Sequence, residues 1–252
     1  MLQGKKGLVV GIANDKSIAW GCARAFHRYG ADLAVTWLND KSEKYVRPLA
    51  EQCGASIIAP LDVQDDRQIE SLFDRIEAEW GKLDFLLHSI AFAPQNDLHG
   101  RVIDCSREGF LMAMDISCHS FQRLAKRAEP LMKDGGALLT VTYMGSERVV
   151  DHYGIMGPVK AALESATRYM AAELGSQNIQ VHAISPGPLL TRAASGIAEF
   201  DTLMTQAQHR APGRRLVTID EIGDLAAFLA SDRSRAITGD VIHIDGGYHI
   251  MG

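Results

Sequence analysis

The chain has 252 residues, of which 46% are hydrophobic and 23% are charged, and its formal net charge at neutral pH is −5. This size and composition predict one globular domain over residues 1–252 with a sizeable core. The acidic balance argues against a nucleic-acid-binding surface and against a polybasic membrane patch.

The sequence also argues against export and membrane insertion. No apolar stretch reaches the roughly 18 residues that a membrane-spanning helix needs. The start, MLQGKKGLVVGIA, lacks a signal-peptide run with a cleavage site, and the four cysteines show no C-x-x-C spacing. We therefore expect a reduced, cytoplasmic protein.

Seven short aliphatic runs alternate along the chain with longer segments of helical periodicity. The runs are KGLVVGI, ADLAVTW, ASIIAPL, LDFLLHSI, ALLTVTY, IQVHAISP and DVIHIDGG. They are almost continuously apolar, as parallel strands covered on both faces are. The helical segments span residues 17–30, 42–54, 66–81, 107–132 and 153–175. This alternation predicts a doubly wound parallel sheet of Rossmann type, flanked by helices.

The first strand-to-helix turn, VVGIANDKSIAWG, predicts a phosphate-binding loop with few glycines. Gly11 leaves the strand, and Ser17 and Ile18 precede a helix N-terminus that favours negative charge. Gly11 by itself is equally typical of a plain turn, whereas the strand–helix–strand context favours a dinucleotide. The second strand ends in TWLNDKS, which has neither an acidic residue for the ribose hydroxyls nor a clear arginine for a 2′-phosphate. We favour NADH, with NADPH less likely.

Two further strand ends carry candidate cofactor contacts. Asp62, followed by Val63, can accept a hydrogen bond from the adenine amino group, or it can cap the following helix. Ser89 and Ile90 stand where the nicotinamide side of a dinucleotide would pass, whereas His88 is expected to be a packed strand residue.

Residues 186–215 interrupt the regular alternation after the sixth run. This segment is long, rich in small residues, and predicted to carry a short helix from Ile197 onward. A long connection at the carboxyl end of a strand usually covers a ligand, although a merely decorative insertion is the alternative.

A Tyr–Lys pair stands at an unusual spacing in the fifth helical segment. Short-chain dehydrogenases carry a lysine four residues after the catalytic tyrosine, but here that position is Gly157 and the lysine is Lys160. A second tyrosine, Tyr143, precedes Tyr153 where a serine would be expected. The set, with GIANDKSIA, HSIAFAP, HAISPGPLLTRAASGI and IDGGYHI, resembles the enoyl-acyl-carrier-protein reductases of bacterial fatty-acid synthesis, a divergent branch of the short-chain dehydrogenases. The resemblance runs from about Gly4 to the C-terminus.

The resemblance implies a role for each matching position. Tyr153 would stabilise, and could protonate, an enolate oxygen; Lys160 would bind the nicotinamide ribose hydroxyls; Tyr143 would position the substrate. The positions that would contact the cofactor are Gly11, Ser17, Ile18, Asp62, Val63, Ser89, Ile90, Lys160 and Thr191. The apolar walls for the acyl chain would be Ala93, Leu98, Met156, Ile197 and Phe200, with Tyr143 beside them.

The reaction that the family catalyses accounts for the spacing. A ketoreductase delivers hydride to a carbonyl carbon, and its acid lies at the oxygen one bond away. An enoyl reductase delivers hydride to the β-carbon of a conjugated thioester, so charge develops on an oxygen three bonds away. The acid must lie where that charge develops.

The resemblance further implies an acyl carrier protein as partner and a homotetramer as the assembly. The nine histidines show no metal-ligand spacing, so no metal is expected. We hypothesise that the carrier docks on Arg214 and Arg215, which follow the helix of the long segment. Two alternatives remain open, namely a short-chain dehydrogenase acting on a carbonyl and a dinucleotide sensor without chemistry.

Overall fold

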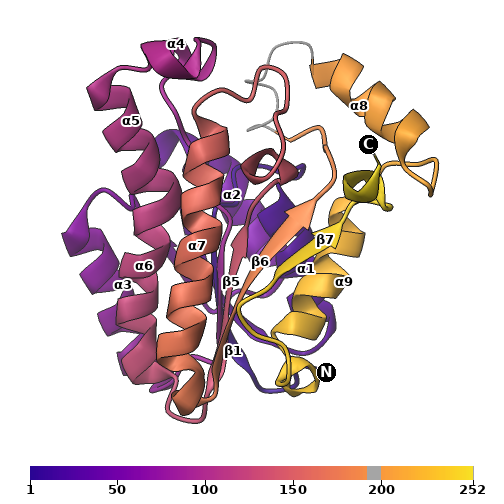
Figure 1. The fold of residues 1–252 in the computed structure, drawn as a ribbon. Helices are drawn as coiled ribbons and strands as arrows, with labels where there is room; N and C mark the ends of the chain where they lie inside the picture. The colour runs from indigo at the N-terminus through magenta and orange to yellow at the C-terminus, as the bar shows by residue number, and fades with distance from the viewer. Residues whose placement is uncertain (192–199, 252) are drawn as a thin grey trace.

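A parallel sheet of seven strands forms the centre of the molecule (Figure 1). The structure is a computed structural model that describes residues 1–191 and 200–251. The strand order is β3-β2-β1-β4-β5-β6-β7, and each neighbouring pair is parallel. The strands are β1 (Lys6–Val10), β2 (Asp32–Trp37), β3 (Ile57–Pro60), β4 (Phe85–His88), β5 (Gly136–Val141), β6 (Ile179–Pro186) and β7 (Val241–Ile244). They coincide with the seven predicted runs, so the doubly wound sheet is confirmed.

Helices cover both faces of the sheet (Figure 1). One layer consists of α1 (Ile18–Arg28), α2 (Asp40–Gln52) and α9 (Ile219–Leu229). The other consists of α3 (Asp66–Trp80), α5 (Arg107–Met114), α6 (Ser120–Ala128) and α7 (Met156–Leu174). Alternate residues of β1 enter the two cores, with Leu8 and Val10 on the α7 side and Val9 on the α1 side. Burial on both faces is why the strands are apolar at successive positions.

The predicted helix over residues 107–132 is divided in the structure. A π-helical turn, Asp115–His119, separates α5 from α6, and a short 3-10 turn, Glu129–Leu131, follows α6. The Ser120 hydroxyl donates to the Ile116 carbonyl at 2.7 Å, a local bond that competes with regular helix geometry. Periodicity does not reveal such a turn, because the apolar pattern continues through it.

Helix α9 was not among the helices predicted from the sequence. Its start carries a reciprocal capping box, in which the Thr218 side chain accepts from the Glu221 backbone and the Glu221 side chain accepts from the Thr218 backbone. The T-x-x-E pattern at these positions was therefore the available signal.

Two further helices lie at the carboxyl end of the strands, α4 (Gln95–Leu98) and α8 (Phe200–Arg210) (Figure 1). Helix α8 forms most of the predicted helix in the 186–215 segment, although Ile197 lies outside the described residues. The strand order reverses between β1 and β4, and ligands of doubly wound sheets bind at such a switch point. Within the described ranges, no helix is both long and apolar enough to cross a membrane.

Candidate active site

Tyr153 lies in the loop that leads into α7 and is only 9% exposed. Its amide donates to the Val150 carbonyl at 3.2 Å, and its own carbonyl accepts from Met156 at 3.1 Å. The next residue, Gly154, has a φ of 50°, and a Cβ there would lie 2.4 Å from the Leu98 carbonyl oxygen. Glycine satisfies both the positive φ and this close approach, so the Tyr153 loop sits directly against the end of α4.

Lys160 lies in the second turn of α7 and is 5% exposed. Its ammonium group, Nζ, donates to the carbonyl of Val141, the last residue of β5, at 2.6 Å. An ammonium group has three donors, so this bond fixes the side chain while leaving it able to bind a ligand.

Tyr143 meets Tyr153 edge to face. Their ring centroids are 5.1 Å apart and their planes are inclined at 61°. Gly145 makes this contact possible, because a Cβ at that position would lie 2.5 Å from Cδ1 of Tyr153. The Tyr143 hydroxyl is buried without a hydrogen-bond partner in the described part of the chain. A buried hydroxyl of this kind fits a site that binds a polar ligand group.

Burial dominates the electrostatics of this pair. It raises the pKa of Tyr153 above its usual value, and the neighbouring Tyr143 and Glu164 raise it further. It lowers the pKa of Lys160 to about 8, against smaller opposing effects of Cys118 and Glu164. Tyr153 is therefore a protonated hydroxyl at neutral pH, able to donate a hydrogen bond to developing negative charge.

The predicted phosphate loop follows β1 and approaches β4. Gly11 has a φ of 111°, and a Cβ there would lie 2.1 Å from the carbonyl oxygen of Ser89. The close backbone of Ser89 therefore requires a glycine at position 11, whether or not a pyrophosphate is bound. The Ser17 hydroxyl accepts from the amides of Ala13 and Asn14, at 3.0 and 3.1 Å, and does not cap α1. This leaves the N-terminal amides of α1, which begins at Ile18, suited to an anion.

The interpretation of Asp62 as a helix cap is wrong. Helix α3 is capped by Asp65, whose side chain accepts from the Arg67 amide, because the helix begins three residues later than that interpretation requires. Asp62 instead accepts from the Gln64 amide at 3.0 Å and is half-buried. Its neighbour Val63 is 3% exposed and belongs to the core.

Several residues predicted for the acyl-chain walls lie in one apolar cluster with the tyrosines. Met156 is 5% exposed and belongs to the same core as Tyr153. The partly buried residues packed against this core include Ile90, Ala93, Leu98 and Tyr143.

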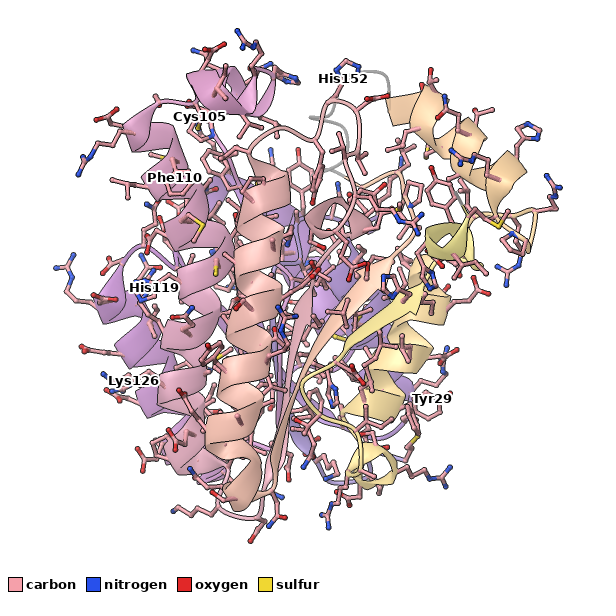
Figure 2. All side chains as sticks on the ribbon, in the orientation of Figure 1. Tyr29, Cys105, Phe110, His119, Lys126 and His152 are labelled. Carbon is pink, nitrogen blue, oxygen red and sulfur yellow. The ribbon has the colours of Figure 1, made fainter. Side chains whose placement is uncertain are left out.

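The remaining predicted site residues lie near the described limits of the 186–215 segment. The Thr191 amide donates to the Leu189 carbonyl at 2.8 Å. Phe200 begins α8, and Ile197 is outside the described residues. His152, which directly precedes Tyr153, is exposed with a φ of 60° and lies at the end of the molecule that carries α4 and α8 (Figure 2).

Known proteins resemble this chain over its full length. A sequence model described as enoyl-(acyl carrier protein) reductase matches residues 11–249. The enoyl-[acyl-carrier-protein] reductase [NADH] 1 of Rhizobium meliloti is 46% identical over 252 residues, covering 100% of this chain and 93% of that protein.

Solved structures agree. The enoyl-acyl-carrier-protein reductase of Anaplasma phagocytophilum, in complex with NAD, has a TM-score of 0.96 and 47% identity, covering 100% of this chain and 96% of that one. The Bacillus cereus enzyme, with NADP+ and an indole naphthyridinone, has a TM-score of 0.97 and 45% identity over 100% and 98% of the two chains. This chain belongs to the enoyl-acyl-carrier-protein reductase family.

His88 is a packed strand residue of this reductase-family chain, as predicted. It is fully buried, with Nε2 2.8 Å from the Ser120 hydroxyl and Nδ1 2.9 Å from the Thr140 hydroxyl. Because Ser120 donates to the Ile116 carbonyl, we assign the ring proton to Nε2, and Thr140 donates to Nδ1. Burial lowers the pKa of His88 to about 3, and the positive charge of Lys160 adds to this.

One buried charged residue near the site had no role in the sequence analysis. Glu164 follows Lys160 by one helical turn and is 4% exposed. An acidic residue on the same helix face as a buried lysine was the signal that could have indicated it. Over residues 1–191 and 200–251, no cluster of three or more His, Cys, Asp or Glu side chains could hold a metal ion. The absence of a bound metal in the protein stays a prediction.

Proposed function

We propose that this chain is an NADH-dependent enoyl-acyl-carrier-protein reductase, which reduces the trans-2 double bond of enoyl thioesters in fatty-acid elongation. The observation that carries the proposal is the grouping of Tyr143, Tyr153 and buried Lys160 beside the end of β5, in a chain of this family. We propose that residues 1–252 act as one domain, and that the protein works in the cytoplasm.

The residues present fit a dinucleotide. Ser17 turns its hydroxyl into the loop and leaves the α1 N-terminus for an anion, while the orphaned Tyr143 hydroxyl and the Lys160 ammonium group can meet polar groups. Bound NADH would supply the hydride that adds to the β-carbon of the substrate. The residues that would hold the cofactor are Gly11, Ser17, Ile18, Asp62, Val63, Ser89, Ile90, Lys160 and Thr191.

The end of β2 supports NADH over NADPH. Leu38 is 55% exposed there and offers no charge to a 2′-phosphate. The side chain of Asn39 is engaged in the capping box of α2 with Ser42. Because the Bacillus cereus enzyme was solved with NADP+, both cofactors belong in the test.

In this proposal the chain contributes mainly electrostatic stabilisation. The Tyr153 hydroxyl donates to the thioester carbonyl oxygen, where negative charge accumulates, and Lys160 keeps the surroundings positive. Tyr143 packs edge-on against Tyr153 and sets its orientation. The acyl chain would lie against Ala93, Leu98, Met156, Ile197 and Phe200.

The outer face of α6 and α7 supports the proposed homotetramer. A surface hollow of about 600 Å³ lies between these helices, lined by side chains that include Ala162, Ala166 and Met170. Tyr169 beside it is 71% exposed. The lining also includes Gln122, Lys126, Glu129, Ser165 and Glu173, so this face mixes apolar and polar groups, and an exposed tyrosine is typical of a subunit interface. Tyr169→Glu should lower the molecular mass measured by analytical ultracentrifugation; an unchanged mass would remove this face from the proposal.

One assay separates the proposed activity from its rivals. The absorbance of NADH, and in parallel of NADPH, is followed with crotonyl or dodecenoyl thioester, and then with an oxoacyl thioester. Oxidation with the enoyl substrate alone supports the proposal. The reverse preference supports a carbonyl reductase, and NADH binding without turnover on either substrate supports a sensor.

A further inference from the structure

Glu164 is a buried charge that its surroundings hold in a defined place. Acidic residues are rarely this buried unless they are paired. Its Oε1 atom accepts from the Thr142 hydroxyl at 2.5 Å and from the Ser146 hydroxyl at 2.6 Å. These distances are typical of hydroxyl groups that donate to an ionised carboxylate.

Both donors belong to the segment that carries Tyr143. Thr142 directly precedes this tyrosine, and the Ser146 hydroxyl also lies 3.0 Å from the Tyr143 carbonyl oxygen. Glu164 is on α7, the helix that begins just after Tyr153. These hydrogen bonds therefore connect the segment after β5, which carries Tyr143, to α7, the helix that follows Tyr153. The rings of the two tyrosines contact each other.

Glu164 also faces Lys160, since residues four apart on a helix share one side. Two other titratable groups face the lysine, Cys118 from the π-helical turn and His88 from β4. Burial raises the pKa of the Cys118 thiol and lowers that of His88 to about 3, so both are uncharged near neutral pH. Of these three neighbours, Glu164 supplies the negative charge near neutral pH, because the effect of Cys118 on Lys160 requires the thiolate, which burial disfavours.

Other groups near Glu164 come from two further elements. Tyr153 and His243 both interact electrostatically with it, the latter from β7. Burial raises the pKa of Tyr153 and lowers that of His243, so both favour their uncharged forms. Of the groups that interact with Lys160 or Glu164, these two are therefore the ones that carry charge near neutral pH, whereas the Asp245 carboxylate acts on Tyr143 and lies 3.0 Å from His249.

We propose that Glu164 is a positioning residue of the reductase site, which orients the Tyr143 segment through Thr142 and Ser146 and balances the buried charge of Lys160. The proposal rests on the proposed function, because Lys160 is taken to bind NADH and the orienting role is measured as kcat for enoyl reduction. In this role Glu164 is needed for the reductase activity although its side chain touches neither substrate nor cofactor.

The first test separates charge from geometry. Glu164→Gln keeps an oxygen that can accept both hydroxyls but removes the negative charge. We expect the pH at which Lys160 loses its proton to fall by about one unit or more. NMR of lysine side chains labelled at the ε carbon, assigned with Lys160→Met, measures this without any substrate. The pH above which NADH affinity declines should fall by a similar amount.

Thr142→Val is the matched control, because it removes one hydrogen bond and keeps the carboxylate. It should leave the Lys160 titration in place and lower kcat more than it raises KM. An unchanged Lys160 titration in Glu164→Gln would overturn the charge-balancing role, and unchanged kcat in Thr142→Val would overturn the orienting role. A wild-type protein that neither binds NADH nor reduces enoyl thioesters would overturn the proposed function instead, with the NMR titration still deciding the role of Glu164.

A second comparison remains decisive if Glu164→Gln does not fold. Lys160→Met leaves the carboxylate unbalanced, whereas Lys160→Met/Glu164→Gln removes both charges. We expect the double variant to have a higher Tm than Lys160→Met alone. A lower Tm for the double variant would mean that the two charges do not balance each other.

Discussion

Gly157 lies against the backbone of Gly145: a Cβ on Gly157 would be 3.0 Å from the Gly145 carbonyl oxygen. Position 157 is where the lysine of a conventional short-chain dehydrogenase would stand. A side chain there would require the Gly145 backbone, which lies against the Tyr153 ring, to give by a few tenths of an ångström. The lysine therefore stands at position 160, and a glycine at 157, in agreement with the close packing of α7 against Gly145.

Moving the lysine back should therefore fail. We expect Gly157→Lys/Lys160→Ala to bind NADH no better than Lys160→Ala alone, because the new side chain cannot take the path that leads to the Val141 carbonyl. Fluorescence titration with NADH measures this. Recovery of wild-type affinity in the double variant would show that the spacing is not constrained by packing.

Tyr153→Phe removes the hydroxyl that we propose meets the developing negative charge, and it keeps the ring contact with Tyr143. Loss of one such donor typically lowers kcat about 10²- to 10³-fold. NADH affinity should change little, since the hydroxyl is assigned to the substrate. Steady-state kinetics together with NADH titration test this, and a drop in NADH affinity as large as the drop in kcat would reassign Tyr153 to the cofactor.

The Lys160 pKa of about 8 predicts two opposite trends above neutral pH. NADH affinity should weaken as pH rises through 8, because the ammonium group loses its proton. The free energy of unfolding should rise between pH 8 and about 10.4, the usual lysine value, because the unfolded chain then binds more protons. Lys160→Met should remove the Lys160 part of both trends. If NADH affinity and the free energy of unfolding of the wild type changed in the same direction above pH 8, the assignment of this pKa to Lys160 would be contradicted.

His88 should make the protein sensitive to acid. Its pKa is about 3 in the fold and near 6.5 in the unfolded chain, so its contribution to stability is complete above pH 6.5 and lost as pH falls toward 3. One such group changes the free energy of unfolding by up to about 1.4 kcal/mol per pH unit. The free energy of unfolding, measured with urea between pH 6.5 and 4, should fall less steeply with falling pH in His88→Gln than in the wild type. His152→Gln, at an exposed position, should keep the wild-type slope.

The carrier-docking hypothesis is sharpened by the ion pairs. The two terminal guanidinium nitrogens of Arg215 donate to Glu221, at 2.9 and 2.6 Å, so replacing Arg215 would disturb the start of α9. Arg210 and Arg214 are exposed, although Arg214 also donates to the His209 carbonyl. We expect Arg210→Glu/Arg214→Glu to raise KM for an acyl-carrier substrate several-fold and to leave KM for a crotonyl thioester of a small thiol unchanged. Equal effects on both substrates would exclude docking at this place.

The sequence predicted what depends on local pattern. The strand runs, the loop at Gly11 and the Tyr143–Tyr153–Lys160 spacing all follow from short segments read in order. What it missed depends on contacts between distant segments. Glu164 accepts hydrogen bonds from the hydroxyls of Thr142 and Ser146, and Gly154 lies against Leu98; no periodicity in the sequence relates these residues. The π-helical turn was missed for a different reason, because one turn of altered backbone leaves the apolar pattern intact.

The contact between Gly11 and Ser89 has a consequence for how the protein folds. The Ser89 amide donates to the Val10 carbonyl at 3.0 Å, yet three helices and two strands separate β1 from β4 in the chain. The loop-closure entropy of that whole segment must be offset before the pair can form. During synthesis, β1 must therefore wait for β4 to emerge before its second neighbour in the sheet is available. We expect the floor of the cofactor site to be among the later contacts of refolding, and substitutions in α1 to α3 to delay its appearance.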